Sequence, residues 1–112
     1  MTQPRIRHIA VNVEDREASA NYYESVFGME IKLRGENGTI YLSDGYVGLA
    51  LINFPDRPWG INHFGFHVDS VDAIEEQAKT TRRSPVGGAV AESWIPDPEG
   101  NRVDVTEECW PV

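Results

Sequence analysis

The sequence has a single cysteine, few basic residues and no long apolar stretch, and each of these features argues against a class of protein. Among its 112 residues there is one cysteine, Cys109, so no disulfide can form within the chain. Its 10 basic residues are outnumbered by 18 acidic ones, which gives a net charge of −8 and favours neither a nucleic acid nor an anionic membrane as partner. No apolar stretch reaches the roughly 20 residues that span a bilayer, and the N-terminal MTQPRIRH lacks the apolar segment of a signal peptide. We therefore expect a cytoplasmic protein.

The sequence resembles itself at an offset of 55 residues. Adding 55 to a position in the first half reaches the same or a similar residue in the second half: Ile6 and Ile61, His8 and His63, Val13 and Val68, Glu14 and Asp69, Ala18 and Ala73, Gly45 and Gly100. A repeat of this period indicates tandem supersecondary units. Since 112 residues are one domain by length, the two units should share one core and build one site.

The first unit, about residues 5–54, has the pattern of a βαβββ module. Residues 6–13 alternate as a strand does, with Ile9, Val11 and Val13 on one face and His8, Ala10 and Asn12 on the other. A helix should follow, with Asp15 as its N-cap, Gly28 at its C-terminal end and an apolar stripe of Ala18, Tyr22 and Val26. Three further strands are predicted over 29–33, 39–43 and 46–54.

The second unit, about residues 61–108, follows a linker at 55–60 that contains two prolines. Its first strand, 61–68, places Phe64, Phe66 and Val68 on one face and His63, Gly65 and His67 on the other. Ser70 should cap a helix over 71–81 with a buried stripe of Val71, Ile74 and Ala78. Two short strands are expected around 86–95, then a turn at 96–100 and a last strand over 101–107.

One face of the predicted sheet collects polar side chains that could bind a metal. Helices pack on the apolar faces of strands, which leaves the opposite faces free to form a concave cavity. Those faces carry His8, Asn12, His63, His67, Asp104 and Thr106. Two imidazoles and a carboxylate suit a divalent transition metal such as Fe, Mn, Zn, Ni or Co.

The two modules, the openings RIRHIAVNVEDREASANYYESVFGMEI and INHFGFHVDSVDAI, and the ending DPEGNRVDVTE resemble the vicinal oxygen chelate superfamily. That superfamily includes glyoxalase I, bleomycin-resistance proteins, methylmalonyl-CoA epimerase and extradiol dioxygenases. The resemblance implies an α+β fold, with two tandem βαβββ modules forming a curved mixed sheet around a metal or ligand cavity. It also implies that His8, His63 and Asp104 are the metal ligands.

The sequence departs from the glyoxalase I pattern in two respects. Branches similar to glyoxalase I place a further carboxylate on the fourth strand of the first module, where this chain has Leu49 or, with a slip of one residue, Ala50. Neither side chain binds metal, so the resemblance implies three protein ligands and several open positions, as in non-haem iron dioxygenases. In addition, Asp104 stands where glutamate is usual, which shortens the ligand by one methylene.

Six further residues are candidates for catalysis or substrate binding. With the usual glutamate absent, the nominees for a catalytic base are His67, Tyr41 and Glu92. His67 lies roughly 13 Å from His63 at the usual strand rise, so it is not a ligand of the same ion, and it could equally be a solvated edge residue. Asn12, Trp94 and Arg102 are candidates for substrate contact. For Tyr41 and Trp94 the alternative is core packing, and for Arg102 it is a position at the solvent rim.

Two functions remain open on the sequence. The first is a metal-dependent enzyme, a dioxygenase or a lyase or isomerase, that acts on a small oxygen-rich substrate chelated to the metal. The alternative is a metal-free protein that binds or sequesters a small molecule, similar to bleomycin-resistance proteins, for which the net charge of −8 would suit a cationic drug. Exposed sheet edges favour a homodimer, and the site could form within one chain or between exchanged halves of two.

Overall fold

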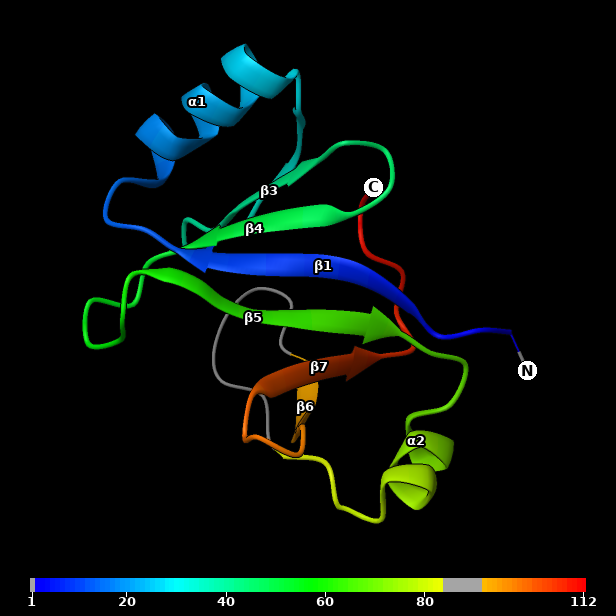
Figure 1. Cartoon of the computed structure of the whole chain (residues 1–112). Helices are drawn as coiled ribbons and strands as arrows, with labels where there is room; N and C mark the ends of the chain where they lie inside the picture. Colours follow the sequence, from blue (N-terminus) through cyan, green and yellow to red (C-terminus); the bar gives the residue numbers. More distant parts are fainter. Residues whose placement is uncertain (1, 84–91) are drawn as a thin grey trace.

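The computed structural model of the chain describes residues 2–83 and 92–112, which form one mixed sheet with two helices (Figure 1). The elements are β1 (Arg5–Asn12), α1 (Arg16–Phe27), β2 (Glu30–Arg34), β3 (Ile40–Ser43), β4 (Gly48–Ile52), β5 (Gly60–His67), α2 (Val71–Ala78), β6 (Ser93–Pro96) and β7 (Arg102–Thr106). The first module therefore has the predicted order of strand, helix and three strands. In the second module, the strand expected near residue 86 lies outside the described residues.

The two opening strands of the modules lie side by side at the centre of the sheet. The strand order is β2-β3-β4-β1-β5-β7-β6. β1 pairs with β5 in antiparallel orientation, β1 pairs with β4 in parallel, and β5 pairs with β7 in parallel. Each opening strand thus has the other opening strand on one side and the last strand of its own module on the other. The predicted α+β class and mixed sheet are confirmed.

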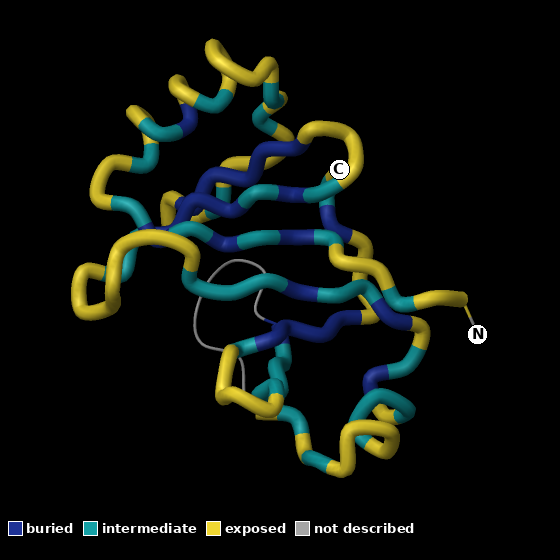
Figure 2. Tube along the Cα trace, viewed as in Figure 1, coloured by how far each residue is buried: buried dark blue, intermediate teal, exposed yellow. Residues whose placement is uncertain are grey.

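Both helices pack on the same face of this sheet. Ala20 of α1 packs against Ile40, Leu42 and Leu51, with Val11 and Val13 at the edge of the cluster, and α2 packs Val71 and Ile74 against Phe66, Val68 and Val105. Val11, Val13, Phe66 and Val68 are on the face that the strand alternation assigned to the helix side. Burial is deepest along β3, β4 and β7 and decreases toward the loops and the outer sides of the helices (Figure 2).

The ends of α1 were predicted correctly, but its buried stripe was not. Asp15 accepts a hydrogen bond from the backbone of Ala18, and Gly28 ends the helix with a φ of 69°. However, Ala18 is exposed, and Tyr22 and Val26 are 53% and 55% exposed, whereas Ala20 is fully buried. The helix carries apolar residues on two sides, and the small Ala20 side chain is the one that allows close contact with the sheet. Periodicity alone could not choose between the two sides.

Helix α2 is shorter than predicted. Ser70 caps it by accepting a hydrogen bond from the backbone of Ala73, as expected, but the helix ends at Ala78 rather than at residue 81. Lys79 adopts a left-handed conformation with a φ of 56°, which terminates the helical hydrogen bonds. As a result Val71 and Ile74 are packed, whereas Ala78, the third member of the predicted stripe, is exposed.

The face opposite the helices has its own apolar cluster. It consists of Ala10, Tyr41, Ala50, Ile52 and Trp110, with Phe54 packed against it. Trp110 comes from the segment that follows β7, so the C-terminal tail folds back over this face of the sheet. No helix within the described ranges is long and apolar enough to cross a membrane.

Candidate metal centre

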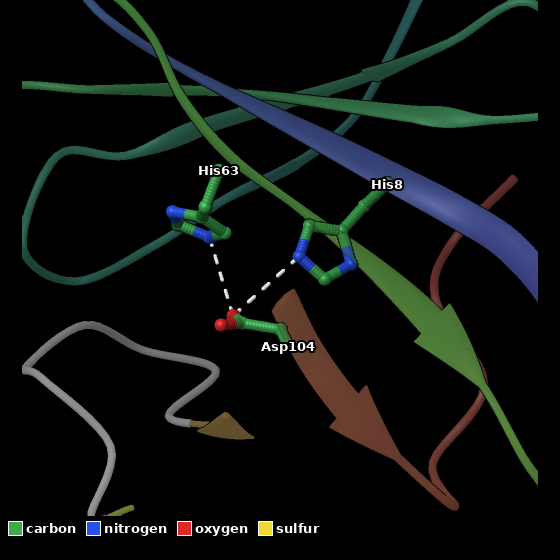
Figure 3. A group of neighbouring side chains, drawn as sticks. All are labelled: His8, His63 and Asp104. Atoms are coloured by element: carbon green, nitrogen blue, oxygen red, sulfur yellow. Dashed lines mark ion pairs between the residues drawn. The ribbon is translucent and has the colours of Figure 1, made fainter. Parts of the chain in front are cut away.

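The structure brings His8, His63 and Asp104 together on the face of the sheet away from the helices (Figure 3). They come from β1, β5 and β7, and one potential ligand atom from each lies within 4.8 Å of the others. The distance from Asp104 Oδ2 is 3.2 Å to His63 Nε2 and 3.6 Å to His8 Nε2. All three residues belong to a single chain, so an exchange of halves between two chains is not needed to complete the group.

A glycine on the neighbouring strand makes room for the His8 ring. His8 pairs with Gly65 across β1 and β5, and a Cβ atom at Gly65 would lie 2.1 Å from His8 Cε1. A side chain of any other residue at position 65 would therefore displace the imidazole. Glycine within a strand often marks such a close approach.

The spacing of these donors fits a bound transition-metal ion. With metal–ligand bonds of about 2.1 Å, neighbouring donor atoms are separated by about 3.0 Å in octahedral and about 3.4 Å in tetrahedral geometry. The measured separations of 3.2 and 3.6 Å lie near these values. In addition, His8 is completely buried, and neither of its ring nitrogens has a hydrogen-bond partner among the described residues. A metal bound at Nε2 would satisfy one of these nitrogens.

Two neighbouring side chains orient the candidate ligands. Asn62 Oδ1 lies 2.7 Å from His63 Nδ1, and as an amide oxygen it accepts the Nδ1 proton, which leaves the Nε2 lone pair directed at the site. Arg102 donates from Nε to Asp104 Oδ1 at 2.6 Å and from Nη2 to Oδ2 at 3.0 Å. This bidentate pair fixes the plane of the Asp104 carboxylate.

The electrostatics favour the protonation states that a metal requires. Burial by itself raises the pKa of Asp104, but the nearby side chains of His63, His8 and Arg102 outweigh it and hold that pKa well below its usual value. Burial lowers the pKa of His8 and so favours neutral imidazole. The carboxylate is therefore charged and the His8 imidazole neutral at neutral pH, and these are the ligating forms.

Glu92 and Trp110 complete the surroundings of His8. The indole of Trp110 stacks on the imidazole, with a centroid distance of 4.0 Å and an interplanar angle of 12°, and its Nε1 donates to Glu92 Oε1 at 2.7 Å. The other carboxylate oxygen, Oε2, lies 3.3 Å from His8 Nε2. Burial is the main effect that raises the pKa of Glu92 to about 7, opposed by the hydrogen bond from Trp110 and reinforced by the charge of Asp104.

Comparison with known proteins identifies the family. Residues 5–105 match the family model described as the glyoxalase/bleomycin resistance protein/dioxygenase superfamily. The chain belongs to this superfamily. A curated relative from Bacillus subtilis (strain 168), named a probable trivalent organoarsenical cleaving enzyme, is 34% identical over 84% of this chain and 73% of its own length. A lactoylglutathione lyase from Escherichia coli O157:H7 is 26% identical over 93% of each chain.

Solved structures of the superfamily share the fold. The 2,3-dioxygenase LapB from Pseudomonas sp. KL28 superposes with a TM-score of 0.72 at 21% identity, over 93% of this chain and 40% of LapB. A methylmalonyl-CoA epimerase from Mycobacterium tuberculosis superposes with a TM-score of 0.66 at 16% identity, over 89% and 85% of the two chains. The fold is thus found in a dioxygenase and in an epimerase, so it does not by itself select between these reactions.

The sheet register shows which of Leu49 and Ala50 is on the His8 side of the sheet. Ala50 pairs with Ala10 of β1 and lies in the apolar cluster on the His8 side, whereas Leu49 packs in the cluster under α1. Of the two alternatives, the residue given by the slip of one position, Ala50, is therefore on the His8 side, and the residue given by the constant offset, Leu49, is on the helix side. Neither side chain binds metal, so the first module contributes only His8 to the converging group.

Asn12 and Arg102, both nominated for substrate contact, are engaged by the protein itself. Asn12 is 1% exposed; its Nδ2 donates to the carbonyls of Phe54, Arg57 and Pro58, and its Oδ1 accepts from the Phe54 amide. It therefore holds the linker between the modules. Arg102, whose side chain is 17% exposed, is bound to the Asp104 carboxylate.

The remaining nominees occupy different surroundings. Tyr41 is 3% exposed and contacts Trp110 edge to face at 5.2 Å, in the wall beside His8. Trp94 is half-buried and pairs with Asp104 across β6 and β7, so it shares the face of the site. His67 is at the end of β5, between Arg5 and Thr106, and it is not a member of the converging group.

Sequence reasoning missed three residues that shape the site. Gly65 could have been found, because it interrupts a strand between His63 and His67, and an internal strand glycine signals a close approach. For Asn62 the only signal in the sequence was its position next to His63. Trp110 gave no signal, because it follows the last strand and nothing in the sequence shows that the tail folds back.

Proposed function

We propose that this chain is a metal-dependent enzyme that uses His8, His63 and Asp104 to hold one divalent transition-metal ion, of the set Fe, Mn, Zn, Ni or Co. The observation that carries the proposal is the convergence of three buried donor atoms within 4.8 Å, with the His8 ring nitrogens unpartnered among the described residues. The substrate would be a small oxygen-rich molecule with two neighbouring oxygens. When bound, such an ion supplies Lewis acidity to these oxygens.

The protein's own residues prepare this chemistry. Arg102 keeps Asp104 ionised and oriented, Asn62 fixes the tautomer of His63, and burial keeps His8 neutral. Trp110 covers one side of the His8 ring and excludes water from it. A rigid, water-poor set of donors strengthens electrostatic stabilisation of charge that develops on a substrate.

Membership of the superfamily leaves two reaction classes for this proposal, a dioxygenase and a lyase or isomerase. The relatives at 34% and 26% identity are named for cleaving organoarsenicals and for lactoylglutathione lyase activity. The substrates of these two enzymes are therefore the first to assay with this protein. The metal-free binder is disfavoured, because it has no need for two in-register histidines that converge on a buried carboxylate.

The test is metal analysis of purified wild-type protein reconstituted with Fe²⁺, Mn²⁺, Zn²⁺, Ni²⁺ or Co²⁺. We expect about one ion per chain in the wild type and its loss in His8→Ala and Asp104→Asn. His67→Ala is the matched control, because it removes a histidine that is outside the group, and it should retain the metal. A wild-type protein that binds none of these ions would contradict the proposal and leave the metal-free binder.

The homodimer stays part of this proposal, with the site formed within each chain. The support is that β2 forms one edge of the described sheet and has four exposed residues out of five. Unpaired edges favour association with a second copy. Sedimentation of the metal-loaded protein tests this, and a monomer at high concentration would contradict it.

A further inference from the structure

We propose that Glu92 is a fourth protein donor to the metal, through Oε2. This inference rests on the proposed function, because it concerns the ion held by His8, His63 and Asp104. Glu92 directly precedes β6, and its side chain is 3% exposed. It therefore approaches the site from the second module, whereas the glyoxalase I pattern places its further carboxylate in the first module, where this chain has Ala50.

The strongest support is a pair of buried atoms that face each other without a hydrogen bond. Glu92 Oε2 lies 3.3 Å from His8 Nε2, and neither atom has a hydrogen-bond partner among the described residues. A carboxylate oxygen and the free nitrogen of a neutral imidazole both offer lone pairs. Two such atoms lie close together in a protein interior only if a proton or a cation is shared between them. The separation of 3.3 Å lies between the values of about 3.0 and about 3.4 Å for neighbouring donors around one metal ion.

The orientation of Glu92 is fixed by a contact that leaves Oε2 available. Trp110 Nε1 donates to Oε1 at 2.7 Å, and the same indole stacks on the His8 ring. Trp110 thus sets the positions of both side chains at once. It is a positioning residue, because it touches the two donors and not the ion.

The charged groups at the site are also compatible with a bound cation. Two buried carboxyl groups, Asp104 and Glu92, face the site, and Arg102 is ion-paired with Asp104. Buried carboxylates are found paired or bound to metals, and a divalent ion would provide such a partner for Glu92.

A fourth donor narrows the reaction class. A six-coordinate ion with three protein donors has three open positions, which accommodate a chelating substrate and dioxygen together. With Glu92 as fourth donor two positions remain, and a substrate that chelates through two oxygens fills both. Four donors therefore favour a lyase or isomerase over a dioxygenase for this chain.

The test is Co²⁺ titration of the metal-free full chain, followed by competition with a chromophoric chelator and by the ligand-field absorption spectrum. Glu92→Gln preserves size and removes the charge; we expect about 10–100-fold weaker Co²⁺ binding and an altered ligand-field spectrum. Glu108→Gln is the matched control, because it makes the same change at an exposed glutamate and should alter neither. Circular dichroism checks folding, and Glu92→Asp, which keeps the charge, provides a second variant should Glu92→Gln fail to fold.

The outcomes separate this inference from the proposed function. If Asp104→Asn loses Co²⁺ while Glu92→Gln keeps wild-type affinity and spectrum, the inference is wrong and the three-donor site stands. If Glu92→Gln weakens binding without changing the spectrum, a crystal structure of the Co²⁺ form decides. A Glu92 oxygen at about 2.1 Å from the ion supports the inference, and a distance beyond about 3 Å overturns it. A wild-type chain that binds no Co²⁺ overturns both.

Discussion

His8 and His63 occupy equivalent positions in the two modules, yet their surroundings differ. His8 is completely buried, lies across Gly65 and is stacked by Trp110, with no hydrogen-bond partner for its nitrogens among the described residues. The His63 side chain is 9% exposed, and its Nδ1 is bonded to Asn62. The residue that pairs with His63 across the strands is Ala10, so His63 lies opposite an alanine whereas His8 lies opposite a glycine.

This difference shows how a repeated unit becomes an asymmetric site. The repeat places one histidine on each opening strand, and the antiparallel pairing of β1 with β5 brings the two rings to a centroid distance of 5.5 Å. The rings are distinguished by residues that differ between the two modules, such as Gly65 and Ala10, and by residues outside the repeat pattern, Glu92 and Trp110. Trp110 and Glu92 lie next to His8 and not next to His63. The additional potential metal donor, Glu92, is therefore on the His8 side of the histidine pair.

The largest expected effect comes from removing the space that Gly65 gives to His8. In Gly65→Ala the new Cβ would meet the His8 ring at 2.1 Å, and Trp110 blocks the retreat of the ring on its other face. We expect metal affinity to fall by more than about 100-fold and the free energy of unfolding to fall by about 1–3 kcal/mol. Metal titration and urea unfolding measure the two effects.

The control for Gly65→Ala is the corresponding residue beside His63. Ala10→Gly should cost about 1 kcal/mol of stability, because glycine is unfavourable within a strand, and it should leave metal affinity unchanged. Equal losses of affinity in the two variants would show that the difference between the two histidine environments does not matter for binding.

A smaller effect is expected from removing the hydrogen bond between Trp110 and Glu92, which lies next to His8 and has no equivalent next to His63 among the described residues. Trp110→Phe retains an aromatic ring beside His8 but removes the Nε1 donor to Glu92. We expect a loss of about 1–3 kcal/mol in the free energy of unfolding of the metal-free protein, because a buried acceptor loses its donor. Trp59→Phe, at a residue that is 47% exposed, should change thermal stability little. Equal melting temperatures for the two variants would show that the indole hydrogen bond does not contribute.

Much of the fold could be predicted because it depends on local patterns. Strand alternation assigned His8, His63 and Asp104 to one face, and the caps Asp15 and Ser70 fixed where the helices begin. The 55-residue repeat identified the two histidines as a related pair. The family resemblance implied that these three residues are metal ligands, and the structure brings their potential ligand atoms within 4.8 Å of one another.

What could not be predicted depends on contacts between distant segments. The orientation of α1 was wrong because Ala20 and the stripe of Tyr22 and Val26 offer two apolar sides, and only packing on the sheet selects one. Trp110 lies far along the chain from His8, and their stacking follows from the path of the tail rather than from any periodicity. Glu92 was nominated as a base, but its approach to His8 was visible only in three dimensions.

The smallest effect is expected far from the two histidines, at a surface contact of the second module. Glu75 accepts hydrogen bonds from the side chain and the backbone of Arg82, and these lower its pKa to about 2. A lowered pKa in the folded state means that the contact stabilises the protein above the unfolded value of about 4.5 and that this contribution is lost as the pH falls toward 2. Glu75→Gln should therefore lower the melting temperature slightly at pH 7 and have no effect near pH 2.

Glu76→Gln, on the exposed side of the same helix, is the control. If the loss of stability in Glu75→Gln at pH 7 persisted unchanged at pH 2, the charge of Glu75 would not be responsible for it. Because this contact is remote from the metal ligands, its loss should leave metal affinity unaltered, in contrast to every change made around His8.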